Sequence, residues 1–108
     1  MSEGGSWCPP MPLRMKVHRQ GRETLLAAAD AAVVGRHLKE GKLALLVSEA
    51  FYGTDDADEA TLVAQLRACT IANLVGDRVV AIAVKHGFVD PELVLVIEGV
   101  PHAQLASL

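Results

Sequence analysis

The residues with the clearest chemical potential in this chain are its histidines and cysteines. They are His18, His37, His86 and His102, with Cys8 and Cys69. Gaps of 19, 49 and 16 positions between successive histidines match no zinc-binding spacing, and the cysteines form no CxxC pair. Cys69 falls on the apolar side of a helical pattern, where a thiol packs as a small hydrophobe; a nucleophile pair with His102 is the alternative. We predict no metal site, no cofactor and no assembled catalytic set, and whether the chain is an enzyme stays open.

Two polar residues stand where packing alone would not place them. Asn73 lies within the apolar run of residues 71–75, so an inward-facing amide there needs hydrogen-bond partners, either from the backbone as a structural clamp or from a ligand. His102 follows Pro101, which would hold it near Gln104 as a recognition surface or proton carrier; the alternative is that this tail merely closes over the sheet. The candidate ligand-binding residues are His102, Gln104, Asn73, Asp77, Tyr52 and Asp30.

Positive charge is concentrated near the start of the chain. Residues 14–42 hold seven basic and three acidic residues, a balance of +4, in a chain of net charge −3. The basic residues are Arg14, Lys16, Arg19, Arg22, Arg36, Lys39 and Lys42. Such a segment attracts polyanions through phosphate contacts, so RNA or a ribonucleoprotein is a candidate partner. The alternative is chance clustering that folding disperses over the surface.

The composition indicates one globular domain. Of 108 residues, 51% are hydrophobic, 4% aromatic and 21% charged, so aliphatic side chains must fill the core. No apolar run approaches the roughly 18 residues of a membrane-spanning helix, and the first residues show no signal-peptide pattern. We expect a cytoplasmic protein without membrane contact, with residues 1–13 as a disordered, proline-rich leader and residues 14–108 as one domain.

The N-terminal half of the domain predicts a hairpin, a helix and a strand. Met15–Arg19 alternates apolar and polar residues, and Glu23–Ala29 would return beside it after a tight turn. Asp30 fits as the N-cap of a short helix near residues 31–38. The apolar run Leu43–Val47 follows as a buried strand.

The C-terminal half predicts two helices and a strand. Asp56 and Glu59 have the spacing of a capping box for a helix whose apolar face continues through residues 71–75. Gly76 would close that helix and Asp77 would cap the next, over residues 78–86. Residues 93–97, LVLVI, form the most strand-like run.

This order, β-β-α-β-α-α-β, predicts a two-layer α+β domain with about four strands and about three helices on one face of the sheet. The alternative is a small mixed α/β sheet, because connections that contain helices permit parallel neighbours.

Three short motifs carry a resemblance to a known family. They are FYG at Phe51–Gly53, TIANLVGD at Thr70–Asp77 and GVPHAQ at Gly99–Gln104. With these motifs the chain resembles the archaeal domain of unknown function family 424, over about residues 15–104. The resemblance implies a cytoplasmic archaeal protein and brings no activity with it.

Three hypotheses for function follow. The leading one is a non-enzymatic binding module for RNA or a ribonucleoprotein in translation, motivated by the basic segment. The second is a small enzyme or ligand-binding domain that uses His102 near Asn73 or Asp77, which requires the tail to form a pocket beside residues 70–77. The third is an obligate homo-oligomer, for example a homodimer, whose apolar tail and strand edge are an interface without a small-molecule site.

Overall fold

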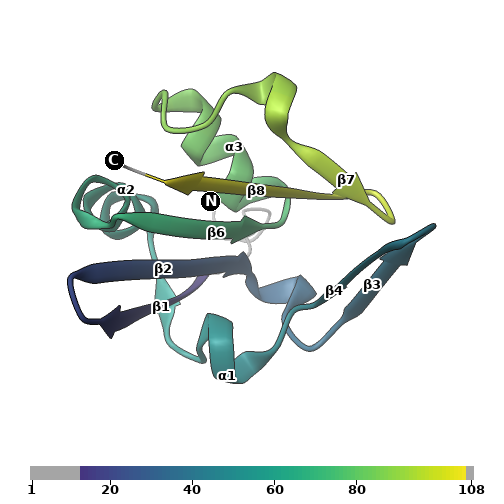
Figure 1. The fold of residues 1–108 in the computed structure, drawn as a ribbon, viewed down its shortest axis with the longest axis horizontal. Helices are drawn as coiled ribbons and strands as arrows, with labels where there is room; N and C mark the ends of the chain where they lie inside the picture. The colour runs from purple at the N-terminus through teal and green to yellow at the C-terminus, as the bar shows by residue number, and fades with distance from the viewer. Residues whose placement is uncertain (1–12, 107–108) are drawn as a thin grey trace, which may run out of the picture.

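The structure is a computed structural model that describes residues 13–106 as eight strands, three α-helices and two 3-10 turns (Figure 1). The strands are β1 (Leu13–Gln20), β2 (Glu23–Asp30), β3 (His37–Glu40), β4 (Leu43–Leu46), β5 (Asp56–Ala57), β6 (Ile71–Val75), β7 (Leu95–Ile97) and β8 (Val100–Ala106). The helices are α1 (Glu49–Tyr52), α2 (Glu59–Ala68) and α3 (Asp77–Lys85), and the 3-10 turns are Ala31–Val33 and Pro91–Leu93. The leader predicted over residues 1–13 lies outside the described residues, apart from Leu13, which begins β1.

Six strands form one mixed sheet in the order β5-β1-β2-β6-β8-β7, and β3 pairs with β4 in a separate hairpin. Strands β2 and β6 run parallel, while the other neighbours are antiparallel. The parallel pair is possible because a long connection containing α1 and α2 carries the chain back to the starting edge. The sheet therefore joins segments from both halves of the chain at its centre.

The predicted count of about four strands is wrong, because β3, β5, β6 and β8 are additional strands. Residues 71–75 do not extend α2. The backbone becomes extended at Cys69, and residues 71–75 form β6 between β2 and β8. Its run of apolar residues suits a central strand that is packed on both sides, and such a run does not distinguish strand from helix by periodicity.

The helix predicted near residues 31–38 is also wrong. Only Ala31–Val33 is helical, as a 3-10 turn, and β3 follows from His37. Asp30 makes no side-chain cap for that turn. Instead its carboxylate accepts hydrogen bonds from the backbone N–H groups of Arg78 and Val79, each at 2.9 Å, and so caps α3 from a neighbouring element.

Asp77 is not the N-cap of α3, because Gly76 occupies that position with φ of +117°. A Cβ atom on Gly76 would lie 2.5 Å from Cγ of Asp30, so glycine alone lets β6 turn into α3 beside this carboxylate. The N-terminus of α2 is capped by Asp58, which accepts from the N–H of Thr61 at 2.8 Å, while Asp56 lies in β5.

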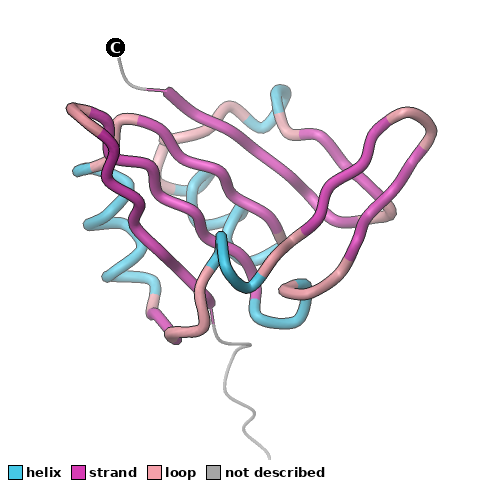
Figure 2. The backbone as a smooth tube through the Cα atoms, turned by 60° about the horizontal axis from the view of Figure 1, so that its bottom comes forward, coloured by secondary structure: helices cyan, strands magenta, loops and turns pink. Residues whose placement is uncertain are grey.

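Helices α2 and α3 cover one face of the sheet and close the main core. That core includes Leu26, Leu62, Leu74, Val79 and Ala83, none of which is measurably exposed. The opposite face receives the short helix α1 and the β3–β4 hairpin, which leans across one end of the sheet (Figure 2). Among the described residues, no helix is long and apolar enough to cross a membrane.

Candidate functional site

Pairing of β6 with β8 brings the second and third sequence motifs side by side. Asn73 is the register partner of Gln104, and Val75 is the partner of His102. Because side chains alternate across a strand, Asn73, His102 and Gln104 lie on one face, opposite the face of Leu74 and Ala103 that contacts the helices. This face is the one that α1 and the hairpin cover only in part.

A cleft of about 390 Å³ lies between this face, α1 and β4. It is lined by Leu45, Leu46, Ser48, Phe51, Tyr52, Asn73, His102 and Gln104. We name it the sheet-face cleft. Its size falls in the range of about 300–1,000 Å³ that is usual for ligand sites. Within the described part of the chain, its lining holds no residue that is charged at neutral pH unless His102 gains a proton.

The two ionisable side chains of the cleft stay neutral near pH 7. Burial raises the pKa of Tyr52 to about 12, because the phenolate loses hydration there. Burial also lowers the pKa of His102 below its ordinary value, since the imidazolium is the form that loses hydration. A neutral imidazole offers one donor and one acceptor, and the tyrosine hydroxyl offers both. The cleft therefore suits a neutral partner group that both donates and accepts.

The side-chain amide of Asn73 has an acceptor without a hydrogen-bond partner within residues 13–106. Its Oδ1 atom is buried, and no described residue donates to it. A buried acceptor without a partner costs about 1–3 kcal/mol, so a donor that reached it would be favoured. In the present orientation Oδ1 is out of reach of water, but the terminal torsion of asparagine is soft, and a turn of the amide would bring Oδ1 toward the cleft.

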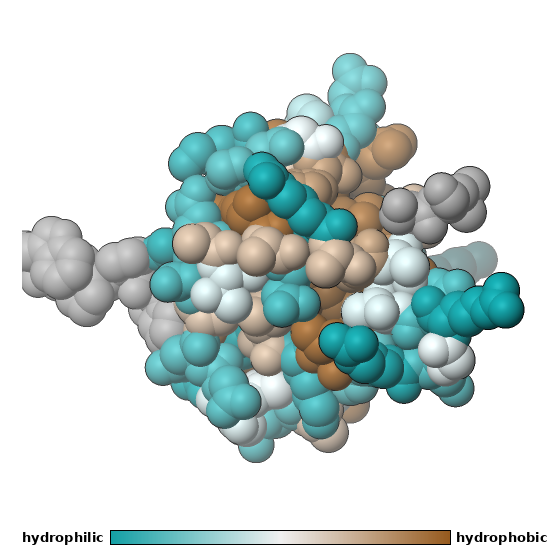
Figure 3. All heavy atoms as spheres, turned by 90° about the vertical axis from the view of Figure 1, so that its left-hand side faces the viewer, coloured by the Kyte–Doolittle hydropathy of each residue, from teal (hydrophilic) through white to brown (hydrophobic). Residues whose placement is uncertain are grey.

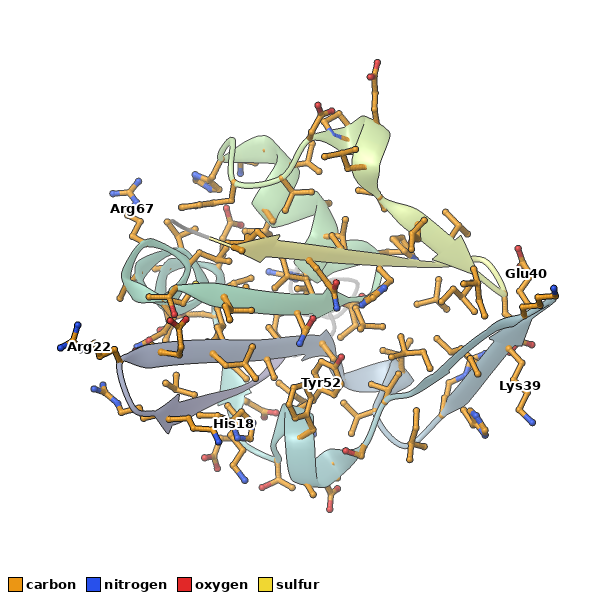
Figure 4. The ribbon with its side chains drawn as sticks, viewed as in Figure 1. His18, Arg22, Lys39, Glu40, Tyr52 and Arg67 are labelled. Carbon is orange, nitrogen blue, oxygen red and sulfur yellow. The ribbon has the colours of Figure 1, made fainter. Side chains whose placement is uncertain are left out.

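Aromatic contacts hold α1 in place beside the cleft. The ring of His18 in β1 stacks on Phe51 with centroids 4.9 Å apart, and its Nε2 lies 2.8 Å from the carbonyl oxygen of Phe51. The rings of Tyr52 and Phe51 are nearly perpendicular with centroids 5.0 Å apart, and Tyr52 points from α1 toward the sheet (Figure 4). Ser48 caps the helix by accepting from the N–H of Phe51. Sequence reasoning missed His18 and Ser48 because only the fold brings β1 under α1.

A second hollow continues from the cleft along the sheet. It has a volume of about 300 Å³ and is lined by Ile71, Asn73, Gln104, Leu105 and Ala106. Asn73 and Gln104 are common to both hollows. The paired amides therefore stand between two adjoining depressions rather than at the bottom of one closed cavity.

The structure separates Asp30 and Asp77 from the other candidate residues. Both line a different hollow of about 650 Å³, together with Arg36, Arg78 and Glu98. Asp30 is 8% exposed and is engaged with the N-terminus of α3, so its role here is structural. The structure thus gathers His102, Gln104, Asn73 and Tyr52, and leaves the two aspartates at another place.

The basic segment does not form one patch. Arg14 pairs with Asp56 at 3.0 Å and also donates to the carbonyl of Thr54, while Lys16 donates to the carbonyl of Ala50 at 3.0 Å. Arg22 lies at the β1–β2 turn, and Lys39 lies in the β3–β4 hairpin at the opposite end of the molecule (Figure 4). The remaining members are Arg19, Arg36 and Lys42, all exposed. Exposed cations therefore stand on both sides of the neutral cleft.

Cys69 and His102 lie on opposite faces of the sheet. Cys69 belongs to the core beneath the helices, and burial raises the pKa of its thiol. Within residues 13–106, no three metal-binding side chains come close enough to hold an ion. The nucleophile pair is therefore not assembled.

A larger hollow, of about 720 Å³, lies on the outer surface of α2. It is lined mainly by Ala60, Val63 and Ala64, and its rim carries Glu59, which binds Lys85 and His86 at 3.1 Å each. Figure 3 shows this end of the molecule, where apolar atoms reach the surface between hydrophilic side chains. The sheet-face cleft is the stronger candidate, because this hollow is lined mainly by alanine and valine and its one carboxylate, Glu59, is already engaged with Lys85 and His86.

Comparison with known proteins identifies the fold and the family. The solved structure of an uncharacterized conserved protein from Methanopyrus kandleri superposes with a TM-score of 0.75 at 23% sequence identity, covering 89% of this chain and 91% of that chain. At this identity the likeness shows a shared fold. A search of curated proteins finds no match. The family model described as "Protein of unknown function (DUF424)" matches residues 18–108, which includes all three motifs, and the chain therefore belongs to the DUF424 family.

Proposed function

We propose that this protein is a non-enzymatic module that binds single-stranded RNA and takes one unstacked base into the sheet-face cleft. The observation that carries the proposal is the buried, unpartnered Oδ1 of Asn73 beside a cleft whose lining is uncharged at neutral pH. A nucleobase is planar and neutral and has both donors and acceptors on its edge, which are the properties that this lining requires.

The charge distribution supports a strand rather than a free base as the partner. Arg22 and Lys39 lie toward opposite ends of the molecule with Tyr52 between them (Figure 4). A strand that crosses this face would place phosphates near the cations and one base over the neutral centre. Single-strand recognition commonly combines unstacked bases with phosphate contacts to a cationic surface.

The test is fluorescence anisotropy with a labelled single-stranded RNA of about a dozen nucleotides. Two phosphate contacts should weaken binding about five- to tenfold between about 50 and 200 mM salt. Arg22→Gln and Lys39→Gln should each weaken binding and reduce this salt dependence. Lys85→Gln is the matched control, because Lys85 lies on α3 on the other side of the sheet and binds Glu59. Absence of salt-dependent binding by the unaltered protein would refute the proposal.

A second proposal, self-association through β7, rests on a separate observation. Strand β7 is the last strand of the sheet, and Leu93, Leu95 and Val96 beside its free edge are 74%, 50% and 51% exposed. Exposed apolar edge strands favour pairing with another chain. Light scattering at micromolar concentration should then show a dimer that Leu95→Lys disrupts; a monomer across this range would contradict it.

A further inference from the structure

We infer that the sheet-face cleft reads the exocyclic amino group of the bound base, so that adenine or cytosine is accepted and uracil is not. This inference deepens the proposed function and depends on it for the source of the base. It rests on how far Asn73 Oδ1 is recessed and on the identity of the groups around it.

The depth of Oδ1 limits which donors can reach it. Asn73 lies on β6 between β2 and β8, at the floor of the cleft, so once the amide has turned toward the cleft, a donor must project beyond the ring of its ligand to reach Oδ1. An exocyclic amino group projects in this way, whereas the ring N–H of uracil is flanked by two carbonyl oxygens. Those carbonyls would approach Oδ1, an acceptor, with their own lone pairs. Uracil therefore leaves the buried atom without a donor and adds repulsion.

The neighbours of Asn73 provide the complementary contacts. The side-chain amide of Asn73 has an acceptor, Oδ1, and a donor, Nδ2. Oδ1 can accept from the amino group of adenine while Nδ2 donates to the adjacent ring nitrogen. Gln104, its register partner on β8, places a second amide at the entrance. His102, kept neutral by its surroundings, supplies either a donor or an acceptor to the remaining edge.

The cleft itself provides space beside these groups. Its volume is about 390 Å³, and it lies between Asn73, His102 and Gln104 on the sheet and the residues of β4 and α1. Phe51 and Tyr52 form an aromatic wall on the other side of the cleft. A flat base therefore has room over the sheet and an aromatic edge against which to pack.

The experiment compares bases that differ in one group. Fluorescence anisotropy would measure the binding of oligouridine strands that carry one central adenosine, inosine or purine riboside. NMR titration would measure the binding of the free nucleosides adenosine, purine riboside, cytidine, guanosine and uridine. Replacing or removing the amino group should weaken binding about tenfold or more, because a buried acceptor is left unpaired. Asn73→Leu should abolish the difference, and Gln104→Leu should reduce it less. Thermal melting establishes that both variants remain folded.

The outcomes separate this inference from the proposed function. Equal, salt-dependent binding of the adenosine, inosine and purine strands would overturn the amino-group readout and leave RNA binding intact. Discrimination among free nucleosides, without tighter or salt-dependent binding of strands, would overturn RNA as the partner and support the readout. Tight binding of guanosine would extend the readout to its own amino group, whereas tight binding of uridine would overturn it. Absence of binding in every arm would overturn both.

Discussion

The two faces of the six-stranded sheet are used differently. The face under α2 and α3 is closed by aliphatic side chains, and Leu26, Leu62 and Leu74 have no exposed surface there. The other face is covered by a four-residue helix and a two-stranded hairpin, and between them it presents Asn73, His102 and Gln104. Both faces use the same strands, so β6 contributes Leu74 to one and Asn73 to the other.

This difference separates stability from recognition. Burial of complete aliphatic side chains contributes about 1.5–3 kcal/mol for each residue, and the helix-covered face concentrates them. The cleft face keeps neutral polar groups near water and leaves one acceptor unpaired, which lowers stability. We expect substitutions in the helix-covered core and in the sheet-face cleft to have opposite consequences, and five experiments examine this, from the largest expected effect to the smallest.

Leu74→Ala should destabilise the protein most, by about 3–4 kcal/mol, because it leaves a cavity in the closed core. Urea denaturation followed by circular dichroism measures the loss. Leu95→Ala is the matched control, since Leu95 is 50% exposed in β7 and should change stability by less than about 1 kcal/mol. Similar losses for both variants would show that the two faces do not differ as described.

Gly76→Ala should destabilise by about 2–3 kcal/mol, because φ of +117° strains alanine and the new Cβ would overlap Asp30. Gly41→Ala is the control: its φ is +61°, but no atom lies within 4 Å of an added Cβ. The difference between their denaturation midpoints reports the combined cost of the more strained φ at residue 76 and of the close approach to Asp30. If the Gly76 variant lost no more stability than the Gly41 variant, the Asp30 cap would not restrict this position.

Lowering the pH should weaken folding through His102. Its pKa is lowered in the folded protein from 6.5, so the unfolded chain binds the proton more readily. The contribution of neutral His102 to folding stability is therefore retained above pH 6.5 and is lost as the pH falls below 6.5 toward the folded-state pKa. Melting temperatures measured from pH 8 to pH 5 should fall less steeply in His102→Gln than in the unaltered protein. His37→Gln, at an exposed position in β3, should follow the unaltered curve.

At high pH a loss of folding stability should come from ionisation of Tyr52. Its pKa of about 12 exceeds the ordinary 10.0, so the stabilising effect is lost as the pH rises from 10 toward 12. Tyr52→Phe should flatten the stability curve in this range.

Asn73→Leu should have the smallest effect on stability, within about 1 kcal/mol and in the favourable direction, because it removes the unpaired acceptor. The same substitution should abolish discrimination between adenosine and purine riboside. A large loss of stability would instead indicate that the amide is a structural clamp, and would contradict the assignment of the site.

Part of the fold could be predicted from local pattern. The hairpin of β1 and β2 is confirmed over the expected residues, because alternating polarity acts over short distances, and its two turn residues are Gly21 and Arg22. Helix α3 is confirmed within a residue at each end. The prediction of a helix over residues 71–75 is wrong because an apolar run suits either state, and pairing with distant strands decides the outcome. The prediction of a helix over residues 31–38 is wrong because the helical turn ends at Val33 and the segment from His37 pairs with β4.

The candidate site shows the same division. Four of the residues gathered at the cleft stand out in the sequence as polar or aromatic residues in unusual contexts, namely Asn73, His102, Gln104 and Tyr52. Only residue type groups Asp30 and Asp77 with them, and the structure places both elsewhere. No local signal could place His18 beneath Phe51, since residues 33 positions apart meet there only after β1 and α1 pack.

The sequence by itself determined the hairpin, the family and the polar residues that packing does not require, because these depend on short-range patterns and residue chemistry. Only the tertiary structure decided that residues 71–75 are a central strand, that Asp30 caps α3, and that the basic residues separate toward the two ends. Long-range strand pairing is responsible, because the register of β6 with β8 places Asn73 beside Gln104 on one face. A shift of one residue in that register would turn Asn73 away from Gln104 and His102.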